Sequence, residues 1–186
     1  MENVGEGWHA ALSQRIGQAV ASRRKALDMT AQQLAERCKD LGVPIHRTTI
    51  TKIENGRSRF DLGELIVLAV ALNTSPVGLV YPGPYEGLVD ITPSVRVTEF
   101  QAAQWFSGLR PALEDDTNAS DAARLRAGYR KSMETLAVLR TIDELQARKA
   151  KVVPTGKELT DEQRAENAFL DRQIDRWLAS LGEDNA

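Results

Sequence analysis

Hydrophobic residues recur every three or four positions through the N-terminal part of the chain, which is the spacing of one helix face. The first such run spans residues 8–27 and places these side chains on one side: Trp8, Leu12, Ile16, Val20 and Leu27. A second helix is expected to begin at Thr30, because Gln33 lies three residues later and the pair can form a capping box. Leu34 and Cys38 would form the buried face of this helix.

A short third helix is predicted over residues 46–54. Ile50 and Ile53 are three positions apart and share one face, and Gly56 can supply the left-handed residue that ends the helix. Because a helix of under three turns is not stable by itself in water, the two isoleucines must pack against other elements. The remaining faces carry hydroxyl and cationic side chains and would stay exposed.

Two further helices complete this part of the chain. Asp61 can cap a helix over residues 62–72, which is apolar around most of its circumference and is therefore expected at the centre of a small bundle. Ser75 and Pro76 are typical of the cap and the first residue of a short last helix. Residues 8–81 are thus expected to form a five-helix domain.

Residues 82–118 differ in composition and are interpreted as a linker. Prolines and glycines punctuate this segment, and the valine and isoleucine residues within 89–97 indicate one or two short extended segments. Residues 100–106 have the pattern of a short helix that buries the rings of Trp105 and Phe106, against the first domain or a second subunit.

Residues 119–182 contain two long helical patterns, so the whole chain is expected to be all-α. The hydrophobic stripe of the first, over residues 121–150, consists of Leu125, Tyr129, Met133, Leu136, Leu139, Ile142 and Leu145. The second opens at Thr160, which can form a capping box with Gln163, and is expected to end at Gly182. The short break between them predicts an antiparallel helical hairpin.

Two helices alone bury little apolar surface, so part of this hairpin is expected to be covered by something else. We expect a second copy of the chain, and the alternatives are a different protein partner or packing on the first domain. The side chains expected at this dimer or partner interface are Leu136, Leu139, Phe169, Ile174, Trp177 and Leu178.

The net charge of the chain is −2, which excludes a basic field over the whole molecule. The charge is uneven, because residues 1–80 carry 10 Lys and Arg residues against 8 Asp and Glu residues. Residues 47–59 contain one acid, Glu54, and the cations Arg47, Lys52, Arg57 and Arg59. A nucleic-acid site would therefore be local.

Other functional classes find little support in the sequence. Cys38 is the single cysteine, so no intramolecular disulfide can form, and a reducing cytoplasm is expected. The sequence shows no signal-peptide pattern and no apolar run long enough to span a bilayer, so no membrane association is expected. It also lacks common hydrolase, nucleotide-binding and metal-ligand motifs, and we expect neither an enzyme nor a cofactor or metal site.

Three segments, taken in order, resemble one known family. They are Thr30-Ala-Gln-Gln-Leu-Ala-Glu, Thr49-Ile-Thr-Lys-Ile-Glu-Asn-Gly-Arg, and Leu65 to Leu72 followed by Ser75-Pro-Val-Gly-Leu. Over residues 10–80 this order resembles the Cro/CI-type (lambda-repressor-like, XRE family) helix-turn-helix transcriptional regulators. The resemblance implies a cytoplasmic, nucleoid-associated repressor that binds a palindromic site in double-stranded DNA as a dimer. The settings it suggests are a phage or prophage immunity repressor and a chromosomal bacterial regulator.

The resemblance also implies roles for individual residues. The helix over residues 46–54 would be the recognition helix, which enters the major groove. Its base-reading positions would be Arg47, Thr48, Thr51 and Lys52. The positions implied to contact phosphates, through side chains and backbone amides, are Thr30, Gln32, Asn55, Gly56, Arg57 and Arg59. Arg24 and Glu54 stand where this family often has an ion pair, which would fix the angle of the recognition helix.

Two features depart from the family pattern. Ala31 stands where the family commonly has Gln, so that contact is lost or moved to Gln32. The connection over residues 39–44 is longer than usual, and the preceding helix is expected to continue to Leu41 with Gly42 as its cap.

Two other functions stay open from the sequence. One is the antitoxin of a toxin–antitoxin pair, which would bind operator DNA with its N-terminal domain and a toxin with its C-terminal helices. The other is a structural helical interaction protein without specific DNA readout.

Overall fold

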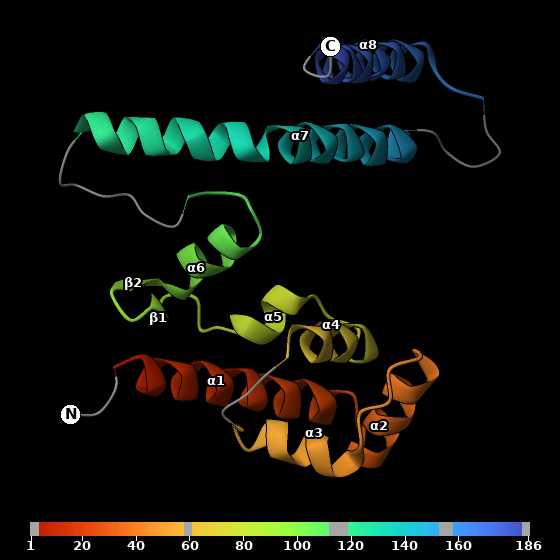
Figure 1. Cartoon of the computed structure of the whole chain (residues 1–186). Coiled ribbons are helices and arrows are strands. Elements are labelled where there is room, and N and C mark those ends of the chain that lie inside the picture. The colour runs from red at the N-terminus through yellow and green to blue at the C-terminus, as the bar shows by residue number, and fades with distance from the viewer. Residues whose placement is uncertain (1–3, 58–60, 112–118, 153–157, 184–186) are drawn as a thin grey trace. The chain divides into compact units, whose positions relative to one another are not determined.

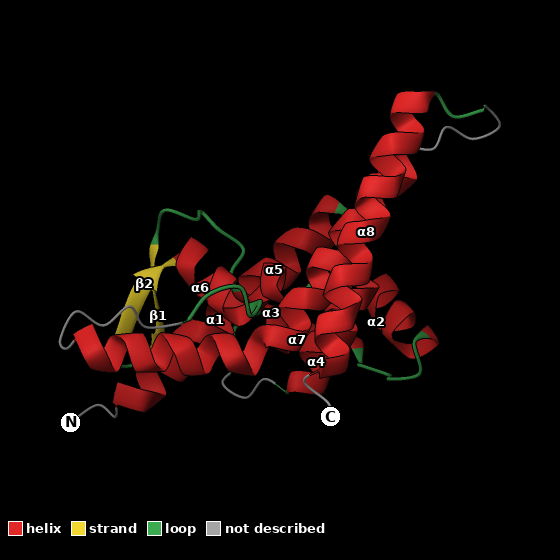
Figure 2. Ribbon diagram, turned by 90° about the horizontal axis from the view of Figure 1, so that it is seen from above, coloured by secondary structure: helices red, strands yellow, loops and turns green. Residues whose placement is uncertain are grey.

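The computed structural model describes residues 4–57, 61–111, 119–152 and 158–183, and it is mostly helical, as the sequence predicts (Figures 1 and 2). The chain divides into two compact units, Met1–Leu113 and Glu114–Ala186, which we call the N-terminal and C-terminal units. Among the described helices, none combines the length and the apolar composition that crossing a membrane requires.

Five helices form the first part of the N-terminal unit. They are α1 (Val4–Ala26), α2 (Ala31–Asp40), α3 (Arg47–Glu54), α4 (Leu62–Ala71) and α5 (Pro76–Val80), so all five helices predicted here are present. The long helix α1 packs against α3 on one side and α5 on the other (Figure 1). The buried side chains with the least exposure in this core include Leu34, Ile50, Ile53, Leu68 and Leu72.

Three helices of this unit, α2, α4 and α5, begin where the sequence predicts, because their capping groups make the expected hydrogen bonds. The first helix instead begins at Val4, four residues before its predicted start, and ends at Ala26. Thr30 and Gln33 form a capping box at the start of α2, and Asp61 and Glu64 form another at the start of α4. The Ser75 side chain accepts a hydrogen bond at the start of α5. Each interaction satisfies backbone N–H groups that have no partner within the first turn of a helix.

The longer connection between α2 and α3 is an ordered turn. The helix α2 ends at Asp40 with Leu41 as its C-terminal cap, one residue earlier than predicted, and Gly42 follows the cap with φ +85°. The Gly42 N–H donates to Lys39 O at 2.9 Å and the Val43 N–H donates to Cys38 O at 3.2 Å, which is a Schellman arrangement. Ile45 then enters the core with 5% of its surface exposed, so the connection is anchored before α3 begins.

A short hairpin and a helix complete the N-terminal unit. Strands β1 (Leu88–Thr92) and β2 (Val95–Thr98) pair antiparallel, and α6 (Glu99–Phe106) follows directly. Val89, Ile91 and Ala102 are buried in the same core cluster as the five helices. The first part of the segment interpreted as a linker therefore packs as part of this unit.

The rings near the end of α6 are less buried than expected. Phe106 is 43% exposed and meets the ring of Tyr81 edge-on at a centroid distance of 5.9 Å, while Trp105 is half-buried. The prediction that both rings are buried is therefore wrong for Phe106. The buried positions of α6 are Glu99 and Ala102, and Glu99 Oε1 accepts a hydrogen bond from the Gly83 N–H at 2.8 Å.

The C-terminal unit contains two long helices, α7 (Ala119–Val152) and α8 (Asp161–Glu183). Arg148 pairs with Glu166 at 2.7 Å and Lys149 pairs with Asp171, while Ile142 packs in one cluster with Ile174. Because partners earlier in α7 lie opposite residues later in α8, the two helices run antiparallel, as predicted.

The buried stripe of α7 differs from the predicted one. Val138 and Ile142 are buried with Leu145 packed beside them, whereas Leu136 and Leu139 are 43% and 48% exposed. The sequence places leucines on more than one face of this helix, so its periodicity did not identify the register that packs on α8. The second helix also continues to Glu183 and does not end at Gly182.

At Gly17 the helix α1 approaches the backbone of α3 too closely for a larger side chain. A Cβ atom added at Gly17 would lie 2.1 Å from Ile53 O and 3.1 Å from Ile53 C. Gly56, which follows α3 with φ +76°, lies against Gln14 of α1, where an added Cβ would be 3.1 Å from the Cα atom. The end of α3 therefore packs directly against the surface of α1 near Gln14 and Gly17.

Replacing Gly17 with Ala is expected to lower the free energy of unfolding by about 1–3 kcal/mol, because overpacking outweighs the gain of about 1 kcal/mol in helix propensity. Gly7→Ala is the matched control, since it lies in the same helix and has no atom within 4 Å of the added Cβ. Unfolding of this unit can be followed through Cys38, which is buried and whose pKa rises to about 11 because burial disfavours the thiolate. Equal rates of Cys38 labelling by DTNB in both variants would contradict the close α1–α3 contact.

Candidate nucleic-acid interface

The outer edge of α3 carries the four residues implied to read bases. Arg47, Thr48, Thr51 and Lys52 are all exposed. At 3.6 residues per turn these four positions fall within an arc of about 140° around the helix axis. The buried residues Ile50 and Ile53, with 0% and 1% exposure, lie on the opposite side and hold α3 on the core.

The four side chains differ in the groups that they leave available. The Thr51 hydroxyl donates to Arg47 O at 3.1 Å, so its methyl group is the part that remains for a contact. Arg47 is the first residue of α3, after the N-terminal cap His46, and Lys52 lies in the last turn. The His46 side chain is exposed and makes no capping hydrogen bond.

The backbone at the end of α3 is already hydrogen-bonded within the protein. The Gly56 N–H donates to Ile53 O at 2.8 Å and the Arg57 N–H donates to Lys52 O at 3.0 Å, which is a Schellman motif. The Asn55 N–H donates to Thr51 O at 3.2 Å. A phosphate contact at this turn would therefore depend on side chains more than on these amides, in contrast to the implied role of the amides.

The arginine that follows this turn is tied to α4. The Arg57 guanidinium forms an ion pair with Glu64, whose carboxylate also belongs to the capping box of α4. This pair joins the turn after α3 to the start of α4. Arg59, the other arginine implied to contact phosphate, lies outside the described residues.

The start of α2 offers exposed polar groups that also have partners within the helix. The Thr30 hydroxyl accepts from the Gln33 N–H at 3.2 Å, and Gln32 Nε2 donates to Glu36 Oε1 at 3.1 Å. Thr30 and Gln32 are exposed, so their side chains can still reach a ligand. The carboxylate of Glu36 beside Gln32 would weaken a phosphate contact there, because like charges repel.

The ion pair expected between Arg24 and Glu54 is present. Arg24 Nε donates to Glu54 Oε1 at 2.6 Å and Arg24 Nη2 donates to Glu54 Oε2 at 2.9 Å. The two side chains are 13% and 14% exposed, and the hydrogen bonds that Arg24 donates to the Glu54 carboxylate raise the pKa of Arg24. Arg24 Nη1 also donates to Met29 O at 2.6 Å, so this arginine joins α1, the turn before α2 and the end of α3.

Two other arginines have structural partners that the sequence gives no sign of. Arg23 donates from Nε to Leu72 O at 3.1 Å and from Nη2 to Asn73 O at 3.0 Å. Arg37 Nη1 donates to Ala71 O at 3.1 Å. Both side chains therefore satisfy main-chain carbonyls at the C-terminal end of α4, where the helix dipole favours a positive charge.

A comparison with protein-family models identifies this region. Residues 20–79, about a third of the chain, match the family described as helix-turn-helix, and they extend from the second half of α1 to α5. Searches of the curated proteins and of the solved structures found no significant match. The N-terminal unit therefore contains a helix-turn-helix DNA-binding domain.

Replacing Glu54 with Gln is expected to lower the free energy of unfolding by about 2 kcal/mol, because Arg24 loses a charged hydrogen-bond acceptor in a largely buried place. DNA affinity should fall as well, since the end of α3 loses its ion pair with α1 and keeps the packing contact at Gly17. The control is Asp90→Asn, which removes the carboxylate of a more exposed pair with Arg96 and should change stability much less. Chemical denaturation measures both variants, and equal changes would show that the Arg24–Glu54 pair does not hold α3.

Proposed function

We propose that this chain, which has a helix-turn-helix domain typical of DNA-binding transcription regulators, is a sequence-specific repressor. In this proposal it binds a palindromic operator as a dimer and blocks transcription by occupying that site. The observation that carries the proposal is the geometry of α3, whose isoleucine face is buried while its opposite edge presents Arg47, Thr48, Thr51 and Lys52. A phage or prophage immunity repressor is one setting that this function fits.

The chemistry of the exposed edge suits a major groove. An arginine can donate two hydrogen bonds to the O6 and N7 atoms of guanine, and a threonine methyl group can contact the methyl group of thymine. Arg47 and Thr48 lie in the first turn of α3, which is the part of a recognition helix that enters the groove first. Lys52, one turn later, would contact a base or a nearby phosphate.

Phosphate contacts would then fix the position of α3 on the duplex. We assign them to the side chains of Thr30, Gln32, Asn55 and Arg57, and to the Gly56 turn that brings Asn55 and Arg57 together. The Glu64 carboxylate would hold the Arg57 guanidinium at the start of α4, and from there the guanidinium would face the phosphates of the DNA. Such contacts position a protein without reading sequence.

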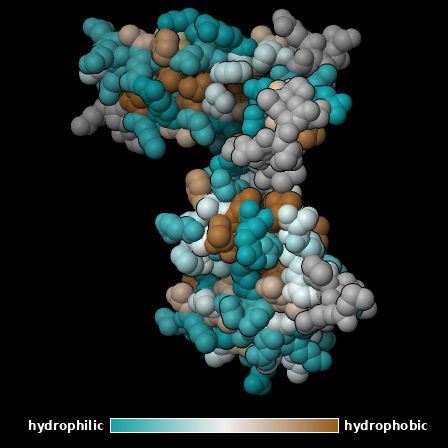
Figure 3. All heavy atoms as spheres, turned by 90° about the vertical axis from the view of Figure 1, so that its left-hand side faces the viewer, coloured by the Kyte–Doolittle hydropathy of each residue, from teal (hydrophilic) through white to brown (hydrophobic). Residues whose placement is uncertain are grey.

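Dimer formation is assigned to the C-terminal unit. Five of the residues expected at this interface are exposed, with exposures between 39% and 52%: Leu136, Leu139, Phe169, Trp177 and Leu178. Ile174, the sixth residue expected at this interface, is buried between α7 and α8 and instead belongs to the hairpin core. Figure 3 shows hydrophobic patches among the hydrophilic side chains of this unit. A second copy would remove such side chains from water and would also match the two halves of a palindrome.

The exposed residues of α8 do not share one face. At 100° per residue, Phe169 and Leu178 are about 180° apart around the helix axis. One flat interface therefore cannot include both side chains. The proposed dimer buries Leu139 together with one of these two residues, and the other lies on the opposite side of α8, outside the interface.

The double substitution Arg47→Ala with Lys52→Ala is expected to weaken binding to the preferred duplex by roughly 30-fold to 20,000-fold, because two lost base contacts cost about 1–3 kcal/mol each. The duplex would come from selection out of a random library, and a gel shift or fluorescence anisotropy at several salt concentrations would measure the affinity. The control is Arg124→Ala with Arg126→Ala, which removes the same charge from exposed positions of α7. Retained specific binding by the first variant would refute the assignment of these readers.

Analytical ultracentrifugation of the full chain is expected to show a dimer that Leu139→Glu converts to a monomer, because a buried unpaired carboxylate is costly. Val70→Glu is the control, since Val70 is 57% exposed in the N-terminal unit. One of Phe169→Glu and Leu178→Glu should also give a monomer, and the other should not. A wild-type monomer would contradict the dimer, and a monomer that co-purifies with an unrelated small protein would favour the antitoxin function.

A further inference from the structure

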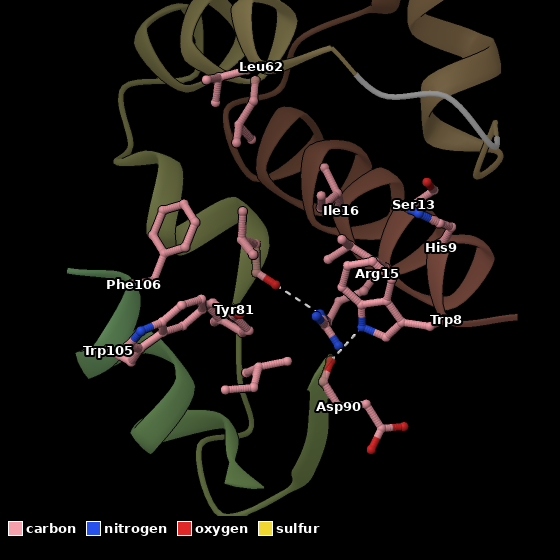
Figure 4. Close-up of a pocket in the computed structure, with 14 residues that line it drawn as sticks. Trp8, His9, Ser13, Arg15, Ile16, Leu62, Tyr81, Asp90, Trp105 and Phe106 are labelled. Carbon is pink, nitrogen blue, oxygen red and sulfur yellow. Dashed lines mark hydrogen bonds between the residues drawn. The ribbon is translucent and has the colours of Figure 1, made fainter. Parts of the chain in front are cut away.

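A pocket of about 530 Å³ lies in the N-terminal unit, on the part of α1 that precedes Gly17 (Figure 4). It is bounded by α1, the start of α4, the end of α5, strand β1 and α6. Its walls include four aromatic side chains, namely Trp8, Tyr81, Trp105 and Phe106. A volume of this size and walls of this kind are typical of small-molecule sites.

Arg15 supplies a positive charge at this apolar pocket. Its Nε donates to Val80 O at 2.8 Å, and its guanidinium lies 5.2 Å from the centre of the Tyr81 ring. Its Nη2 atom is buried and has no hydrogen-bond partner among the described residues. An unsatisfied buried donor is costly, and a charged one more so, which makes this atom a place where an acceptor would bind.

The one carboxylate among the residues that line the pocket is already paired. Asp90 accepts two hydrogen bonds from Arg96, at 2.5 Å and 2.9 Å. The main-chain oxygen of Asp90 accepts from Trp8 Nε1 at 3.0 Å. In Figure 4 the Asp90 side chain points away from Arg15. Arg96 lowers the pKa of Asp90 most, and the charge of Arg15 adds to this effect. The Arg15 Nη2 atom nevertheless makes no hydrogen bond among the described residues, so it can bind an anion from outside the chain.

We propose that this pocket binds a small amphipathic monocarboxylate. Its carboxylate accepts a hydrogen bond from Arg15 Nη2, and its apolar body lies against Trp8, Tyr81, Trp105 and Phe106. One guanidinium among apolar walls suits a single negative charge on a hydrophobic molecule better than a multiply charged phosphate. A charge-assisted hydrogen bond among these mostly apolar walls gives the carboxylate its advantage over a neutral analogue.

The pocket is separate from the surface assigned to DNA. Residues Arg47 to Lys52 of α3 do not line it, and Arg15 has no role in the proposed reading of bases. Ligand binding can therefore be tested on the full chain without DNA, and a negative result would leave the proposed repressor function intact.

The test uses decanoate and its neutral analogue decanol, both below the concentrations at which they aggregate, titrated against the full chain by isothermal calorimetry. Trp8 and Trp105 line the pocket, so a change in tryptophan fluorescence gives a second readout. The expected result is saturable one-to-one binding of decanoate that is at least about tenfold tighter than that of decanol, because decanol lacks the charge-assisted bond. Equal affinities, or no binding of either, would overturn the proposal.

Two variants test whether the charge of Arg15 causes the preference for decanoate over decanol. Arg15→Met keeps the apolar stem and should abolish the preference for decanoate over decanol, while binding to DNA is unchanged. Lys25→Met removes the same charge from an exposed position of the same helix and should keep the preference. If Arg15→Met fails to fold, the comparison of decanoate with decanol on the wild-type chain still decides the question. An Arg15→Met protein that folds and prefers decanoate as the wild type does would refute the site.

Discussion

A helix of eight residues has little stability of its own, so α3 depends on the surface against which it packs. That surface is α1. Gly17 lets the backbone of α3 come close at Ile53, and the Arg24–Glu54 pair fixes the end of α3 a short distance further along. With Ile50 and Ile53 buried, the rotation of α3 about its own axis is determined, and its polar edge must face outward. The direction of that edge is the property on which the proposed DNA recognition depends.

The charges of the N-terminal unit serve structure as much as binding. Arg23, Arg24, Arg37 and Arg57 all donate hydrogen bonds to carbonyl or carboxylate groups of other elements. Arg47 and Lys52 are exposed on α3. A count of basic residues therefore overstates the positive charge that is available to a nucleic acid. A local site with only a few cationic side chains agrees with the small net charge of the chain. Arg15 is a further case, since its partner is a carbonyl and one of its nitrogen atoms stays unsatisfied.

Much of the N-terminal unit could be predicted from sequence because its signals are local. The pair Thr30 and Gln33 marks a helix start by itself, and Ile50 with Ile53 marks a buried face. Partners distant in the chain could not be predicted in this way. Nothing near Gly17 shows that α3 passes over it, and nothing near Arg37 shows that a carbonyl of α4 lies within reach. The face of α7 that packs on α8 could not be predicted either, because leucines occur on more than one face of α7. The position of α8 decides which of them are buried.

Amide NMR spectra of the full chain, recorded while a selected duplex is added, test the orientation of α3 most directly. If its outer edge faces DNA, the largest shift changes will occur at residues 46–57 and at the start of α2, and residues 161–183 will change little. Largest changes in β1, β2 or α8, with α3 unaffected, would contradict this account.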